Sequence, residues 1–253
     1  MSEASATQPP ADQSTAASLG LISRFVGILT APRATYAAVV AKPRWFGMIA
    51  ALVIVGVVAG TALMSTDAGR LAALDASRSQ MKAFGINLDP QAEQAMEKAL
   101  METPLWRMAL QTSIGQIGAG FLMPLVMAGI FFLVFNAIMG GEATFKQVLA
   151  TVAHGNAVLL VGALFTTPLM YFRGSFSGVT NLGVFLPMLD ETSFLAKLLG
   201  QIDLIRIWWV FVLAVGLAVL YRRKTGPIAT ALFVVYGLIA IIFAAVTAGR
   251  GGA

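Results

Sequence analysis

The residue best suited to acid–base or ligand chemistry is His154, the only histidine in the 253-residue chain. It lies within an apolar stretch, with Asn156 two residues later, and Asn136 lies near the end of the preceding apolar stretch. Ionisable residues inside membrane helices are costly and are often functional. A lone histidine cannot form a metal site, and no acidic residue at mid-depth completes a proton relay. Two interpretations of His154 stay open, a structural hydrogen-bonding residue and a polar site within the membrane.

Two oppositely charged pairs have helical spacing. Asp203 and Arg206 are three residues apart, and Glu142 and Lys146 are four apart, so each pair shares one helix face. Ion pairs that position a helix are the simpler interpretation of both. The Gly140-Gly141 turn lacks the later Gly-Lys-Ser/Thr of a phosphate-binding loop. With no cysteine in the chain either, we expect neither an enzyme nor a cofactor.

The composition is that of a protein whose solvent is partly lipid. The chain is 58% hydrophobic and only 11% charged, with a mean hydropathy of +0.81. A soluble domain carries about 25% charged residues. The charges fall mostly between the apolar runs, as expected for membrane-spanning segments. The sequence predicts an all-α fold, a polytopic membrane helical bundle of about five transmembrane helices with interfacial amphipathic helices.

The expected spans are residues 46–64, 114–139, 148–172, 205–221 and 228–248. Nineteen helical residues in the first span extend about 28 Å, close to the roughly 30 Å hydrocarbon core. Gly56 and Gly60 in this span form a GxxxG pair, which lets another helix approach closely. Tight packing within the chain and homodimerisation are both compatible with this pair.

The remaining segments are expected outside or along the membrane. Residues 1–17 are polar, without the apolar core of a cleavable signal peptide, and are expected to be a disordered arm. Residues 18–45 predict two short amphipathic helices, lying in the cytoplasmic interface or packed on the bundle. Residues 65–112 predict an extramembrane helical insertion, 173–204 an interfacial segment, and 249–253 a short tail.

Basic residues beside the spans predict the orientation. Six of them are candidate cytoplasmic anchors: Arg33, Lys42, Arg44, Arg222, Arg223 and Lys224. With five crossings all six lie on one side, which the positive-inside rule assigns to the cytoplasm. We therefore expect a multi-pass protein of the inner (cytoplasmic) membrane with its N-terminus inside and its C-terminus outside. The anionic lipids of the cytoplasmic leaflet are the expected partner of these cations, and nucleic acid is not.

Three short stretches together resemble the Yip1 domain family of integral membrane proteins. They are Ile28-Leu29-Thr30-Ala31-Pro32-Arg33-Ala34-Thr35-Tyr36, then Gly140-Gly141-Glu142-Ala143-Thr144-Phe145-Lys146-Gln147, and Asp203-Leu204-Ile205-Arg206-Ile207-Trp208-Trp209. The resemblance implies five spans and a cytoplasmic N-terminus. Eukaryotic members are linked to vesicle trafficking, small-GTPase partners and membrane shaping. This chain lacks their acidic, aromatic arm with an Asp-Leu-Tyr-Gly-Pro pattern and is similar to the compact bacterial members, so the GTPase role is not carried over.

Two functions remain open at this point, with a third that depends on the fold. The first is a non-enzymatic protein that organises membrane lipid or protein partners, including further copies of itself. The alternative is a permease or channel component with a polar cavity formed by His154 and Asn156 near the helix kinks at Pro124 and Pro168. A membrane-embedded enzyme requires acids from the outer segments to reach His154. A water-accessible cavity at His154 distinguishes transport from organisation.

Overall fold

The computed structural model describes residues 19–174, 178–190 and 192–250. Within these residues every regular element is helical, which confirms the all-α prediction. The elements are α1 (Leu21–Thr30), α2 (Pro32–Ala41), α3 (Phe46–Met64), α4 (Asp67–Ala83), α5 (Pro90–Glu102), α6 (Leu105–Phe132), the π-helix η1 (Leu133–Ile138), α7 (Phe145–Gly155), α8 (Ala157–Arg173), the 3₁₀ helix η2 (Leu182–Phe185), α9 (Phe194–Gln201), α10 (Leu204–Leu220) and α11 (Thr225–Arg250).

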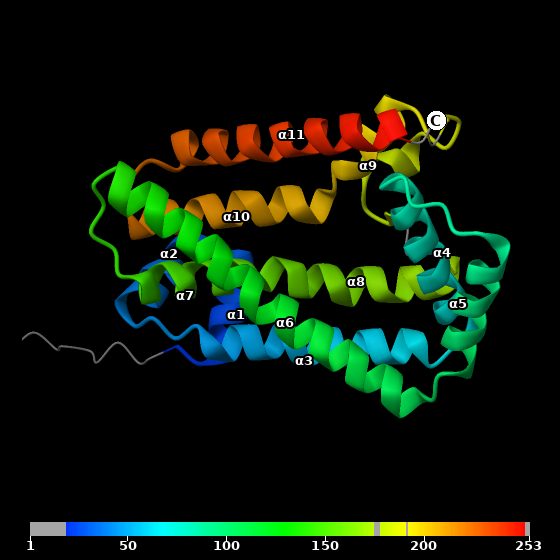
Figure 1. The fold of residues 1–253 in the computed structure, drawn as a ribbon. Coiled ribbons are helices and arrows are strands. Elements are labelled where there is room, and N and C mark those ends of the chain that lie inside the picture. Colours follow the sequence, from blue (N-terminus) through cyan, green and yellow to red (C-terminus); the bar gives the residue numbers. More distant parts are fainter. Residues whose placement is uncertain (1–18, 175–177, 191, 251–253) are drawn as a thin grey trace, which may run out of the picture.

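The long helices run alongside one another and form the body of the molecule (Figure 1). Four stretches are long and apolar enough to cross a membrane, namely Phe46–Met64, Leu105–Ile138, Phe145–Arg173 and Thr225–Ala248. The fifth expected span corresponds to α10, a shorter apolar helix of 17 residues beside α11. At 1.5 Å per residue α10 extends about 26 Å, most of a roughly 30 Å hydrocarbon core.

The bundle is buried at its centre and apolar on its outside. In the most apolar 18 residues of α7–α8, 72% of residues are buried inside the protein. The corresponding share is 22% in α3, 22% in α6–η1 and 17% in α11. Large apolar side chains such as Ile54, Leu122 and Ile242 are more than 60% exposed on these outer helices. An apolar surface of this extent is unstable in water and stable in lipid. The fold is therefore that of a membrane-embedded helical bundle.

Small residues allow α3 and α6 to pack closely. A Cβ on Gly56 would meet the side chain of Gln116 at 2.6 Å, and one on Gly60 would meet Thr112 at 2.8 Å. In return, a Cβ on Gly120 would lie 2.4 Å from Val53. The GxxxG pair thus faces α6 of the same chain and is covered by it.

The α4–α5 hairpin covers one end of the bundle (Figure 1). Thr66 and Asp89 cap the two helices with side-chain oxygens, and Arg78 joins them through an ion pair with Glu97. The next helix, α6, begins at Leu105, before the start of the predicted span at residue 114. Pro104 fixes that start, because a proline suits a helix N-terminus and no further proline follows until Pro124.

The α1–α2 hairpin packs on α7 and α10 near the other end of the bundle. Ile28, Tyr36 and Val39 are fully buried against these helices. Arg24 is also buried, while Ile22 and Val26 of the same helix are 79% and 48% exposed. A buried arginine together with exposed apolar side chains on one helix is the opposite of the arrangement in a soluble protein and suits contact with lipid.

Candidate functional site

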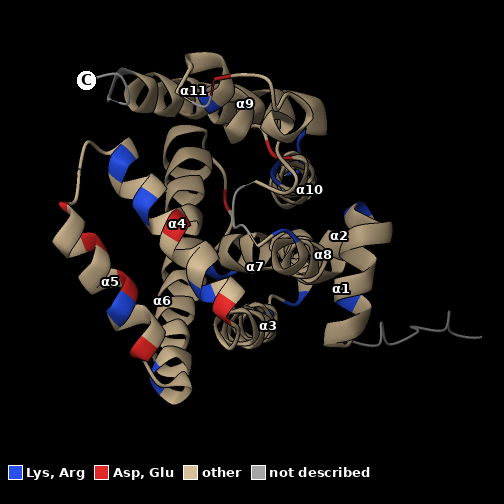
Figure 2. Cartoon of the chain, turned by 90° about the vertical axis from the view of Figure 1, so that its right-hand side faces the viewer, with Lys and Arg blue, Asp and Glu red and all other residues tan. Residues whose placement is uncertain are grey.

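The end of the bundle formed by α1, α2, α7 and the turn between α10 and α11 carries a large positive charge, and we call it the basic end. Among the described residues it holds eight basic side chains and one carboxylate, that of Glu142. The basic residues are Arg24, Arg33, Lys42, Arg44, Lys146, Arg222, Arg223 and Lys224. At the opposite end, on α4 and α5, acidic and basic residues alternate (Figure 2). The net charge of the chain is therefore concentrated at one end.

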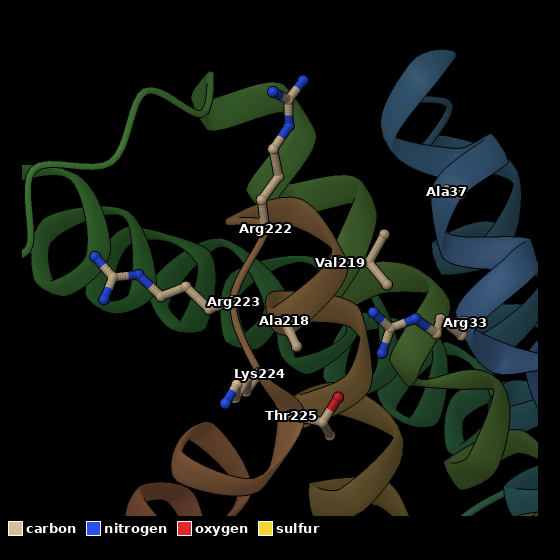
Figure 3. A pocket seen from close by; sticks show the side chains of 8 residues that line it. All are labelled: Arg33, Ala37, Ala218, Val219, Arg222, Arg223, Lys224 and Thr225. Carbon is tan, nitrogen blue, oxygen red and sulfur yellow. The ribbon is translucent and has the colours of Figure 1, made fainter.

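The basic turn, residues 221–224, connects α10 to α11. Arg222 has a φ of 51°, a left-handed conformation that ends α10, and the Arg223 N–H donates to the Ala218 carbonyl at 2.9 Å. All three basic side chains of the turn are exposed. They diverge, with Arg222 pointing away from Arg223 and Lys224 (Figure 3). The turn therefore presents cations to two sides of the basic end.

Asn136 fixes this turn to the rest of the bundle. The Tyr221 hydroxyl donates to Asn136 Oδ1 at 2.8 Å, and Asn136 Nδ2 donates to the Ala143 carbonyl at 2.6 Å. The Tyr221 ring also stacks on Phe135, with ring centroids 4.7 Å apart. Asn136 and Phe135 belong to the π-helix η1, an irregularity that is frequent at functional sites.

A groove with four cations lies between α2 and the basic turn. Its volume is about 690 Å³, and it is lined by Arg33, Ala37, Ala218, Val219, Arg222, Arg223, Lys224 and Thr225. Arg33 extends from α2 toward Ala218, Val219 and Thr225 (Figure 3). Guanidinium groups bind phosphate through paired N–H donors, so this groove suits an anionic headgroup.

The six predicted anchors are all exposed, and none takes part in an ion pair with a described residue. Arg24 behind them is buried without a carboxylate partner. Burial lowers the pKa of Arg24, and the neighbouring Arg44 lowers it further. Among the described residues of this end, Glu142 is the one carboxylate and it pairs with none of the cations, so the end suits an external anion.

His154 lies inside the bundle and away from this groove. It is fully buried at the end of α7, and its Nδ1 lies 2.7 Å from the Ala150 carbonyl of the same helix. Because a carbonyl only accepts, Nδ1 carries the proton, and Nε2 has no partner among the described residues.

The polar residues proposed with His154 have separate partners. Asn156 interrupts α7–α8 and accepts a hydrogen bond from Trp209 Nε1 at 3.0 Å. Asn136 binds Tyr221 and Ala143 at the basic end, so both its polar atoms are engaged. His154, Asn156 and Asn136 therefore bond to three different parts of the protein. No hydrogen bond among the described residues joins any two of them.

The two proposed ion pairs have other contacts. Asp203 caps α10, accepting from the Arg206 backbone N–H at 3.0 Å and from the Thr180 hydroxyl. Near Glu142, Thr144 and Gln147 form a capping box that starts α7. Neither Asp203–Arg206 nor Glu142–Lys146 forms an ion pair among the described residues. Backbone capping satisfies the Asp203 carboxylate at its helix end, where a pair with Arg206 was expected from spacing alone.

Several contributors were not identified from the sequence. Tyr36 and Trp209 lie in the stretches that resemble a known family, and residue 221 ends an expected span, but their contacts come only from the structure. Tyr221 bonds to Asn136, Trp209 bonds to Asn156, and Tyr36 is fully buried. An asparagine within an apolar span needs a polar partner, and a tyrosine or tryptophan on another span can supply it. This rule could have identified Tyr221 and Trp209 from the sequence. The described residues also contain no cluster of His, Cys, Asp and Glu suited to a metal ion.

The comparison with protein families gives a match over most of the chain. The Yip1 domain model matches residues 26–248, which include the three stretches named in the sequence analysis, the helices α2 to α10 and most of α11. No curated protein and no solved structure is similar enough to count as a match. Because the family model covers nearly the whole bundle, this membrane protein belongs to the Yip1 domain family.

Proposed function

We propose that this protein is a non-enzymatic membrane organiser that binds anionic phospholipids at its basic end. The supporting observation is the charge distribution, with eight cations and one carboxylate among the described residues of that end. Seven of these cations, all but Arg24, are exposed, and none of the seven forms an ion pair with a described residue. Near an anionic leaflet each Lys or Arg contributes about 1 kcal/mol of attraction. The summed attraction of these cations is large enough to favour anionic over zwitterionic lipids.

The same distribution supports an orientation. The positive-inside rule assigns the basic end to the cytoplasm, which puts the start of α1 inside and the end of α11 outside. The long helices alternate in direction from α3 to α11 in Figure 1, as five crossings require. An inner bacterial membrane with an anionic inner leaflet is the proposed location.

Permeation is the second candidate, and the burial of His154 weighs against it. A transport path needs a polar site open to water, whereas His154 is 0% exposed and bonded to its own helix. The unpartnered Nε2 is the observation that keeps this candidate in view. A partner protein also remains part of the proposal, but the GxxxG face of α3 is occupied by α6 and unavailable to it.

The test replaces the three cations of the basic turn with glutamine in the full chain, as R222Q/R223Q/K224Q. The matched control is K82Q/K98Q/R107Q, which removes the same charge from the opposite end. Each protein is reconstituted in bilayers of equal anionic and zwitterionic phospholipid, and the lipid that co-purifies in mild detergent is quantified. We expect wild type and control to retain mainly anionic lipid and the turn variant to lose at least half of this excess. An equal excess in all three proteins would refute the proposal.

A further inference from the structure

Beside the basic turn, a second groove opens between the η1 end of α6 and the start of α11. Its volume is about 510 Å³, and ten of its twelve lining residues are apolar. They are Ile130, Phe131, Val134, Phe135, Met139, Pro227, Ile228, Ala231, Leu232 and Val235. The other two are Arg223 and Lys224. This apolar groove therefore has its only charged residues at one end.

The groove has a closed floor and open walls. Phe131, Phe135 and Ile228 are at most 7% exposed and form the floor, whereas Ile130 and Val235 on the two walls are 51% and 52% exposed. α6 packs mainly on α3 and α7, and α11 on α9 and α10, so neither helix closes the groove over the other. An open apolar trough between two lipid-facing helices is accessible to an acyl chain from the bilayer.

The dimensions fit one leaflet. From Pro227 to Val235 the groove follows α11 for roughly 12 Å, at 1.5 Å per residue. Half of a hydrocarbon core of roughly 30 Å is about 15 Å. A chain that lies in this groove therefore runs from the basic turn toward the middle of the membrane and ends there.

The π-helix η1 determines which residues at the end of α6 line the groove. Ile130 near the end of α6 and Val134 in η1 are four residues apart, and the Met139 N–H donates to the Val134 carbonyl at 3.0 Å, across the five-residue spacing of a π-helix. This places Met139 on the groove wall, and the Met139 carbonyl accepts from Arg223 Nη2 at 3.2 Å. The contact holds the Arg223 guanidinium at the mouth of the groove, with Lys224 beside it.

We infer that the apolar groove binds one acyl chain of an anionic phospholipid, whose phosphate lies against Arg223 and Lys224. This inference rests on the proposed function and adds a defined binding position to it. The two cations select the charge of the headgroup, and the floor of Phe131, Phe135 and Ile228 selects a chain of lipid length. A free phosphate or a soluble anion satisfies only the first requirement.

Substitution of Ala231 tests the groove without disturbing the core. Ala231 is exposed on the groove wall of α11, so A231W fills the trough with an indole ring. The control A245W places the same ring at an exposed position of α11 that does not line the groove. Binding of phosphatidylglycerol with long chains, and with six-carbon chains, is measured by native mass spectrometry on the full-length proteins.

For wild type and A245W we expect long-chain phosphatidylglycerol to bind at least tenfold more tightly than the six-carbon form. For A231W we expect the long-chain affinity to fall to that of the short form. If A231W binds long-chain lipid as wild type does, the groove is not the site, although the charge-based function stands. If no protein prefers phosphatidylglycerol to phosphatidylcholine, both proposals fail. A dimer that dissociates in A231W would assign the groove to a second copy and overturn the lipid assignment.

Discussion

At the scale of single residues, Asn136 connects three segments at the basic end. Its amide joins η1 to the 140–144 connection through Ala143 and to the basic turn through Tyr221. Both hydrogen bonds are partly buried, so the carbonyl of Ala143 and the hydroxyl of Tyr221 depend on this amide for a partner. The amide therefore sets the position of the cations that follow Tyr221.

Two substitutions separate the hydrogen bond from the ring stack. Tyr221→Phe keeps the stack on Phe135 and removes one hydrogen bond, so we expect a loss of about 1 kcal/mol in unfolding free energy. Asn136→Ala leaves two polar groups without their partner and should cost about 1–3 kcal/mol. Denaturant unfolding in detergent micelles measures both. An Asn136→Ala protein as stable as wild type would show that the amide does not hold the turn.

At the scale of elements, the α1–α2 hairpin packs on α10, and the two approach closely at Gly216. A Cβ on Gly216 would lie 2.6 Å from the Tyr36 ring and 2.8 Å from the Thr151 methyl group. Tyr36 is fully buried, so its ring has no space into which to move. This glycine therefore allows the hairpin to dock and places Arg33 beside the basic turn.

We expect Gly216→Ala to destabilise the protein by about 1–3 kcal/mol, the usual cost of overpacking. Because the added methyl group pushes Tyr36 outward, the hairpin should also become more accessible to protease. Gly118→Ala is the control, since nothing lies within 4 Å of the added Cβ there. Thermal unfolding and limited proteolysis report the two effects. Equal behaviour of the two variants would contradict the docking role of Gly216.

The sequence predicts the elements better than the contacts. Composition and apolar runs predict the helices, and the bounds of α3 match the expected span, because length and hydropathy alone determine a crossing. The break at Asn156 and the π-helix at Asn136 are not visible as patterns, because they depend on partners on other helices. For the same reason, spacing suggested ion pairs for Asp203 and Glu142, whereas Asp203 caps α10 and the cap of α7 is formed by Thr144 and Gln147 beside Glu142. The cations of the basic end could be predicted from the sequence, since they flank the spans. The apolar groove could not, because its walls come from α6 and α11, which are far apart in the sequence.

At the scale of the whole molecule, the charge distribution predicts the orientation in the membrane. The chain contains no cysteine, so single cysteines at Thr225 in the basic end and Ser79 on α4 can be labelled without background. We expect a membrane-impermeant thiol reagent to label the Ser79→Cys protein on intact cells and the Thr225→Cys protein only after permeabilisation. If the Thr225→Cys protein were labelled on intact cells, the orientation would be the opposite of the predicted one, and the basic end would lie at the outer leaflet.

The central claim is that the basic end selects anionic phospholipid by charge, and one measurement on the wild-type protein tests it directly. The protein is reconstituted in bilayers of equal phosphatidylglycerol and phosphatidylcholine with identical acyl chains, and the ratio of the two lipids next to the protein is measured at low and high salt. We predict an excess of phosphatidylglycerol that shrinks as salt screens the exposed cations, since the Debye length falls from about 10 Å at 0.1 M to about 3 Å at 1 M. Equal amounts of the two lipids at low salt would contradict the account.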